Sequence, residues 1–121
     1  MSDIRSENRR FTRVAIDLPV EVHQGGSVWR QRLIDLSLAG AATDQPDRWD
    51  AQYNEPFTLV LHTGGDDTIE LHAYLQHVEQ GRLGFAVQHV DRENIQPLLE
   101  LMRSHMDEPE LLEAELAQLE N

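Results

Sequence analysis

The chain has 121 residues and a formal net charge of −12. All of its basic residues are arginine, and there is no cysteine, which excludes disulfides, thiolate zinc sites and a cysteine nucleophile. This length predicts a single domain with one modest core. DNA or RNA binding is disfavoured, because so acidic a protein repels a long polyanion.

The charge is distributed unevenly. Residues 1–13 carry four arginines and two acidic residues, whereas residues 14–90 and 91–121 each have a net charge of −7. A compact ligand with two phosphates needs only a local positive pocket of this kind. The N-terminus is polar, and no apolar run reaches membrane-spanning length, so we expect a cytoplasmic protein without membrane insertion.

The first predicted element is a flexible, arginine-rich arm over residues 1–13, which ends in Arg9-Arg10-Phe11-Thr12-Arg13. The planar guanidinium fork of arginine fits phosphate and the O6/N7 edge of guanine. Further along, Asp35-Leu36-Ser37-Leu38-Ala39-Gly40 forms a turn whose aspartate can accept hydrogen bonds from the N1–H and N2–H₂ edge of guanine. The two segments suggest a site for a phosphorylated guanine compound.

Six short strands are predicted within residues 14–90. The first strand shows strict alternation, with Pro19 on the outward set indicating an unpaired edge there, and its inward residues are Val14, Ile16, Leu18, Val20 and Val22. In the second strand, residues 28–36, both Trp29/Leu33 and Val28/Ile34/Leu36 are possible inward sets. Four more strands follow near residues 40–43, 57–61, 69–75 and 83–87, the last two joined by a tight hairpin at 79–82. This spacing favours a mainly β fold, a small closed antiparallel barrel.

Helical periodicity replaces the strand pattern in residues 91–121, which we expect to pack on the barrel as C-terminal α-helices. The first helix has Asp91 or Asn94 as its cap, and we expect it to begin near Asn94, because Pro97 is then in the first turn. Asp107 and Glu110 form a capping-box pattern for a second helix, in which Pro109 suits an early position. The apolar face of that helix packs on the barrel or its neighbour helix, or forms a partner surface; it consists of Leu112, Leu116 and Leu119.

The two polar segments resemble the motifs of the PilZ domain family, bacterial receptors for cyclic di-GMP. Members carry Arg-x-x-x-Arg before the first barrel strand and Asp/Asn-x-Ser-x-x-Gly between the second and third strands. Here these motifs are Arg9…Arg13 and Asp35-x-Ser37-x-x-Gly40, and the likeness covers about residues 7–105. Either motif alone has an ordinary explanation, as a solvated charge cluster or a plain turn. The resemblance implies a six-stranded PilZ-like split barrel.

The resemblance also implies roles for individual residues. Arg13 would contact a guanine edge or a phosphate, while Arg9 and Arg10 would clamp phosphates or stack on purines. Asp35 would accept hydrogen bonds from guanine, and Ser37 would contribute a hydroxyl contact. Gly40 would allow close backbone approach to the ligand or adopt a positive φ.

Two further positions bear on the ligand. Relatives that capture two intercalated cyclic di-GMP molecules have an arginine just before the first motif arginine, where this chain has Asn8, so we expect one ligand per domain. His77 shares inward parity with Leu71 and Leu75 on the fifth predicted strand. It is either a base contact or a partly buried structural histidine.

The predicted function is that of a stand-alone, non-enzymatic cyclic di-GMP receptor or adaptor in second-messenger signalling. Ligand would order the arm over the barrel and create a surface for an unidentified downstream protein, in a process such as motility or biofilm formation. No cofactor or metal is expected, since His72 and His77 face opposite sides of one strand. The alternatives are a degenerate PilZ-like interaction module without nucleotide binding and an enzyme acting on a guanine nucleotide, for which no nucleophile or metal motif is present.

Overall fold

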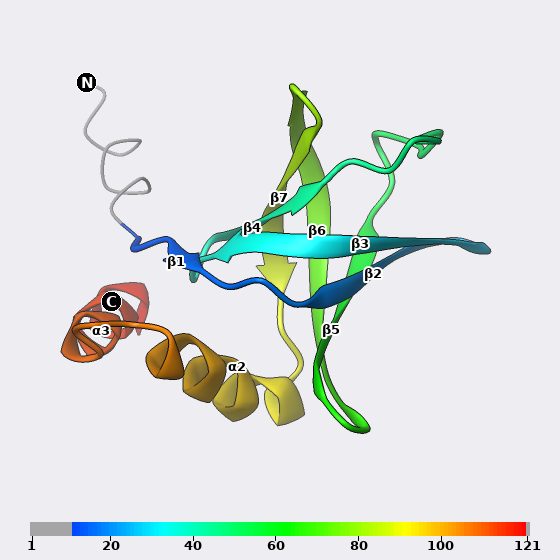
Figure 1. Ribbon diagram of the computed structural model, residues 1–121. Helices are drawn as coiled ribbons and strands as arrows, with labels where there is room; N and C mark the ends of the chain where they lie inside the picture. The colour runs from blue at the N-terminus through cyan, green and yellow to red at the C-terminus, as the bar shows by residue number, and fades with distance from the viewer. Residues whose placement is uncertain (1–10, 121) are drawn as a thin grey trace, which may run out of the picture.

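The computed structural model describes residues 11–120, with side chains described as far as residue 117 (Figure 1). Seven strands are followed by two helices. In chain order they are β1 Val14–Ala15, β2 Pro19–Gln24, β3 Ser27–Leu36, β4 Gly40–Asp44, β5 Phe57–Gly64, β6 Asp67–Glu79, β7 Arg82–His89, α2 Arg92–Ser104 and α3 Glu110–Glu120.

Six of the strands form a closed antiparallel barrel, as predicted. The hydrogen-bonded order is β1-β3-β2-β5-β6-β7-β4, and an additional β3–β4 pairing closes the ring. β1 lies outside the ring and pairs only with the end of β3. In Figure 1, α2 runs below the barrel, and α3 follows it on the side of the molecule where β1 lies.

The first predicted strand is interrupted. Val14 to His23 was expected to be continuous, but β1 ends at Ala15 and β2 begins at Pro19. Ile16 and Leu18 are nevertheless buried, so the alternation correctly identified the core face. Pro19 is opposite Arg32 of β3, whereas the pairing of β2 with β5 begins only at Val20. Pro19 is therefore unpaired on its β5 side, as expected of a residue that has no N–H to donate.

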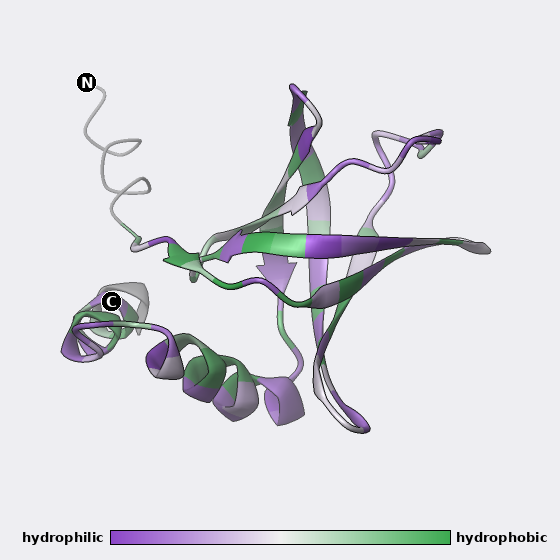
Figure 2. Cartoon of the chain, viewed as in Figure 1, coloured by the Kyte–Doolittle hydropathy of each residue, from purple (hydrophilic) through white to green (hydrophobic). Residues whose placement is uncertain are grey.

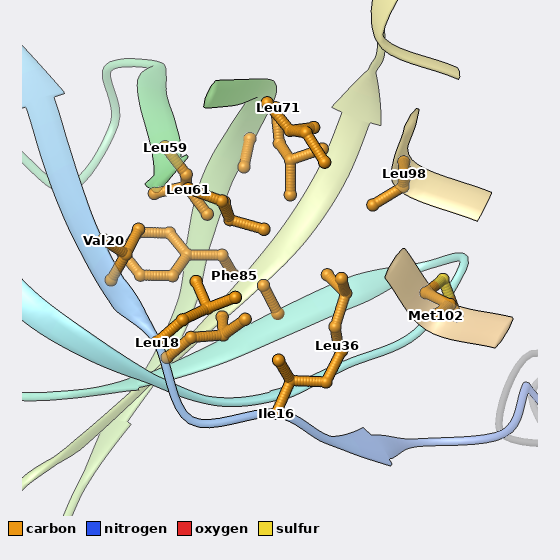
Figure 3. Packing of buried hydrophobic residues seen from close by; sticks show 14 of the residues in the cluster. Ile16, Leu18, Val20, Leu36, Leu59, Leu61, Leu71, Phe85, Leu98 and Met102 are labelled. Atoms are coloured by element: carbon orange, nitrogen blue, oxygen red, sulfur yellow. The ribbon is translucent and has the colours of Figure 1, made fainter. Parts of the chain in front are cut away.

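The barrel interior is a continuous hydrophobic cluster that extends onto α2 (Figure 3). In β3 the Trp29/Leu33 set faces inward, since Leu33 is buried and Val28 is exposed. Ile34 is only partly buried, while a register shift between Leu33 and Asp35 allows Leu36 to be buried as well. In Figure 3 the α2 side chains Leu98 and Met102 extend from their helix toward the barrel residues.

The first helix begins two residues earlier than predicted. Asp91 is the N-cap and Arg92 the first helical residue, so Pro97 lies inside the helix beyond its first turn. The Asn94 side chain does not cap the helix; its Oδ1 accepts a hydrogen bond from the backbone N–H of Glu70, at 3.1 Å. This tertiary contact and the apolar face of α2, visible as hydrophobic stripes in Figure 2, offset the cost of the internal proline.

The second helix packs on the core through Leu112, with Leu116 partly buried against the same cluster. α3 begins at Glu110, directly after Pro109, and Leu112 is fully buried while its neighbour Leu111 is exposed. Neither α2 nor α3 combines the length and the apolar character required to cross a lipid bilayer.

The adjacent leucines of α3 provide a matched test of this packing. Leu112→Ala should lower the free energy of unfolding by about 2–5 kcal/mol, because it removes a fully buried side chain. Leu111→Ala should change that free energy by about 0.5 kcal/mol or less, since exposed positions contribute little. Urea denaturation followed by circular dichroism measures both; equal effects would mean that α3 does not dock through Leu112.

Candidate functional site

A groove of about 990 Å³ lies beside the turn that joins β3 to β4. Its walls come from four segments that are far apart in the sequence. These are Phe11 and Arg13 before β1, the turn and start of β4, the last residues of β6 and the first residues of β7. The groove therefore lies where the sequence placed the two motifs.

Asp35 links two arginines at the edge of this groove. Its Oδ1 accepts from Nη1 of Arg13 at 3.2 Å, and its Oδ2 accepts from Nη2 of Arg82 at 2.9 Å. The Asp35 side chain is only 13% exposed, whereas those of Arg13 and Arg82 are 64% and 49% exposed. Each guanidinium thus uses one N–H on the carboxylate and presents others to solvent, where they can donate to an anion.

This arrangement changes the part that Asp35 plays. The sequence pointed to a carboxylate free to accept from guanine, but both carboxylate oxygens are engaged by arginine. In this state Asp35 positions Arg13 and Arg82. Each carboxylate oxygen has a second lone pair, and a direct contact with guanine stays a prediction.

Ser37 stabilises the turn itself. Its Oγ accepts hydrogen bonds from the backbone N–H groups of Ala39 and Gly40, at 3.2 and 3.1 Å, and the Ser37 N–H donates to the Gly40 carbonyl at 2.8 Å. The side chain therefore has a structural role, in addition to the ligand contact that remains a prediction.

Gly40 is needed because β4 and β7 approach closely. A Cβ at this position would lie 2.8 Å from the carbonyl oxygen of Phe85 on the neighbouring strand β7. The expectation of a positive φ was wrong, since the positive-φ glycines are at other positions: Gly25, Gly64, Gly65 and Gly81. The close approach is to the neighbouring strand.

His77 lies on the outside of the barrel, and its predicted inward parity was wrong. A register shift between Leu75 and His77 places the histidine opposite Gly84, so the simple alternation fails there. His77 is exposed and lines the groove. Its ring occupies the space that a side chain on Gly84 would fill. The histidine is therefore a surface group over β7 and not a partly buried one.

Arg82 is the functional side chain that the sequence did not reveal. The hairpin at 79–82 was predicted, and its central residues Gln80 and Gly81 both have positive φ, at 53° and 76°. The sequence signal therefore identified the turn. It did not indicate that Arg82, the first residue of β7 after this turn, lies beside Asp35. Arg9 and Arg10, the other predicted clamp residues, lie outside the described residues.

Titratable clusters lie elsewhere on the barrel. His23 and His62 donate to the carboxylate of Glu21 and lower its pKa, with the His23 hydrogen bond as the largest cause. The ligand atoms of His72 lie near those of Glu70 and Asp91, and not near His77; these three residues are of types that could hold a metal ion. Neither cluster is part of the groove lining.

Several solved structures share this fold. The chain aligns with the inhibitor of motility MotI/DgrA from Bacillus subtilis at a TM-score of 0.65 and 17% identity, over 78% of this chain and 48% of that one, so it spans about half of that relative's length. It aligns with the PilZ domain of YcgR from Escherichia coli, determined with c-di-GMP, at a TM-score of 0.63 and 21% identity, over 80% and 90%. For the PilZ domain of CeSA from a cellulose-synthesizing bacterium the TM-score is 0.58 at 24% identity, over 75% and 94%.

These structures define the class as a PilZ-like β-barrel with C-terminal helices. The PilZ domain family model matches residues 7–104, which include both motifs. The chain belongs to the PilZ domain family.

Proposed function

We propose that this protein is a cyclic di-GMP receptor whose ligand occupies the groove beside Asp35. The observation that carries the proposal is the pair of exposed guanidiniums, Arg13 and Arg82, fixed by one carboxylate at the edge of a groove of about 990 Å³. That volume is at the upper end of the roughly 300–1,000 Å³ of small-molecule sites. The PilZ domain of YcgR, which shares the fold, has been determined with c-di-GMP.

The groove supplies groups for each part of the ligand. Arg13 and Arg82 donate to phosphate or to a guanine O6/N7 edge. The His77 ring, exposed over Gly84, offers a flat surface on which a purine can stack. These contacts hold the ligand through hydrogen bonds and stacking and break no covalent bond, as expected of a receptor.

The charge balance explains why the arm is needed. The described groove lining holds two arginines, Arg13 and Arg82, and one acidic residue, Glu79. A ligand with two phosphates carries more negative charge than this lining neutralises, in a protein with a net charge of −12. Arg9 and Arg10 supply the remaining positive charge in our proposal. With Asn8 before them, one ligand binds per domain.

The output is proposed to pass from the arm to α3. Thr12 lies between Phe11 and Arg13, which both line the groove, yet its own backbone N–H donates to Oε2 of Glu115 in α3 at 2.9 Å. The Thr12 hydroxyl donates to the same oxygen. Ligand that draws residues 11–13 into the groove would therefore alter the contact with α3, and the resulting surface is available to a downstream protein.

The first test is calorimetric titration with cyclic di-GMP, with GTP and cyclic GMP as controls. Arg13→Ala or Arg82→Ala should weaken binding roughly tenfold to a hundredfold, because each removes charge-assisted hydrogen bonds worth about 1.5–3 kcal/mol. Arg32→Ala is the matched control, since Arg32 is also half-exposed and ion-paired, with Asp17 at 2.8 Å, but is not part of the groove lining.

Several outcomes would contradict the proposal. No saturable binding in calorimetry and in a spectroscopic titration would favour an interaction module without nucleotide binding. An equal effect of Arg32→Ala would indicate general electrostatic attraction and not a groove contact. Turnover of the nucleotide, detected by chromatography, would instead indicate an enzyme.

The link from the arm to α3 can be tested separately with a fluorophore. The chain has no cysteine, so Leu111→Cys on the exposed face of α3 gives a single labelling site. We expect nucleotide to change the fluorescence of the labelled protein, and Glu115→Ala to abolish that change while nucleotide still binds. Glu113→Ala, which removes an ion pair with Arg103 and no arm contact, should preserve it. Loss of the signal in both variants would contradict the link.

A further inference from the structure

A second polar cluster joins β6, β7 and the start of α2. His72 of β6 and His89 of β7 are opposite each other in the sheet, and their rings stack with centroids 5.7 Å apart. The Nε2 atoms of the two rings lie 3.3 Å from Oδ2 and 2.9 Å from Oδ1 of Asp91. The cluster thus connects the barrel wall to the residue that begins α2.

Asp91 is directed to this cluster and not to its own helix. It is the N-cap of α2, yet its side chain makes no capping hydrogen bond. Hydrogen bonds from His72 and then His89 lower the pKa of its carboxyl group, so the group is ionised at neutral pH. The hydrogen bond from His89, which does not involve a proposed ligand atom of His72, preorganises this carboxylate as a ligand.

Glu70 completes a set of possible metal ligands. It lies two residues before His72 on the same strand, and one ligand atom from each of Glu70, His72 and Asp91 lies within 4.8 Å of the other two. Among residues 11–120 this is the one group of three such side chains that meets this distance. The Asn94 side chain, which bonds the Glu70 backbone, also holds the first turn of α2 against this part of β6.

We propose that Glu70, His72 and Asp91 bind a divalent transition-metal ion of the zinc type, with His89 orienting the Asp91 carboxylate from outside the coordination shell. Imidazole nitrogen and carboxylate oxygen bind Zn²⁺ at about 2.0–2.2 Å, which places neighbouring ligand atoms about 3.3 Å apart. Nε2 of His72 and Oδ2 of Asp91 are already 3.3 Å apart, and the ion would replace the hydrogen bond between them, with the imidazole proton then carried on Nδ1. Glu70 is exposed and on the surface, so rotation of its side chain can close the third bond.

Such an ion would fix α2 to the barrel. It would connect a strand residue, His72, with the helix cap, Asp91, and leave further coordination positions for water. The proposal does not depend on cyclic di-GMP, because none of these residues lines the groove. Exposed ligands and a position open to water predict weaker binding than in a buried structural zinc site.

A second cluster in the same protein provides the control. Glu21 accepts from His23 at 2.9 Å and from His62 at 3.1 Å, so it has the same types of side chain at similar exposure. Among the residues that the structure describes, however, its three side chains do not bring one ligand atom each within 4.8 Å of one another. Binding that reflects only surface histidines would involve both clusters equally.

The experiment is calorimetric titration of the untagged, metal-free chain with Zn²⁺ at pH 7.5, with Co²⁺ absorption spectra as a report of coordination. We expect one ion per chain and a rise in Tm. Glu70→Gln and His72→Gln should each weaken binding at least tenfold, and His89→Gln about tenfold or more. His62→Gln should leave binding unchanged.

Because Glu70 is exposed, Glu70→Gln should fold normally, and a circular dichroism spectrum can verify this. Absence of saturable Zn²⁺ binding to the wild-type chain would overturn the proposal. So would equal losses in His72→Gln and His62→Gln, or unchanged binding in a folded Glu70→Gln variant.

Discussion

The pairing of β3 with β4 closes the barrel, and the groove depends on it. β3 is bonded along one edge to β1 and β2 and along the other to β4. Near its end, Asp35 is opposite Ala15 on one side and Ala42 on the other. Because paired strands flank Asp35 on both sides, its backbone is held in place. The Arg13 and Arg82 side chains therefore bond to a carboxylate whose position is set by the sheet.

The rest of the groove follows from that fixed point. The short turn after β3 is stabilised by the Ser37 hydroxyl, and Gly40 permits β4 to run directly against β7. β7 then begins with Arg82, which reaches the second oxygen of Asp35. Arg13 reaches the first oxygen from the opposite direction. Two cations from segments far apart in the sequence thus meet at one buried anion.

This local arrangement reconciles an acidic protein with an anionic ligand. Two arginines elsewhere on the described surface each pair with an exposed acid of their own: Arg32 with Asp17 and Arg103 with Glu113. At the groove, Arg13 and Arg82 share the buried carboxylate of Asp35, and Glu79 is the one acidic residue in the described lining. In our proposal, the remaining donors of those two guanidiniums determine where a compact dianion binds.

Much of the fold could be predicted from the sequence, because alternation identifies the buried face wherever a strand is regular. The pattern from Val14 to Val22 gave the correct core residues, although the strand is interrupted between Ala15 and Pro19. Arg13 from the first motif and Ser37 and Gly40 from the second line one groove. A coarse period of two cannot reveal a register shift, and for that reason the side on which His77 lies was predicted wrongly.

Other features depend on contacts between distant residues and leave no local signal. Arg82 looks like an ordinary hairpin residue until the closed barrel brings it to Asp35. Asp91 looks like a helix cap, and only the pairing of β6 with β7 reveals two histidines bonded to it. The early start of α2 has the same origin, because a tertiary bond to Asn94 is not encoded in the spacing of leucines.

The most direct test of the groove is peptide-resolved hydrogen–deuterium exchange with and without saturating cyclic di-GMP. Backbone amides that become covered by ligand, or are held by a fixed arm, exchange more slowly. The account predicts slower exchange in peptides covering residues 11–13, 37–42 and 76–86, with β2 and β5 unchanged. Protection confined to β2 and β5, or bound nucleotide with no protection near Asp35, would contradict it.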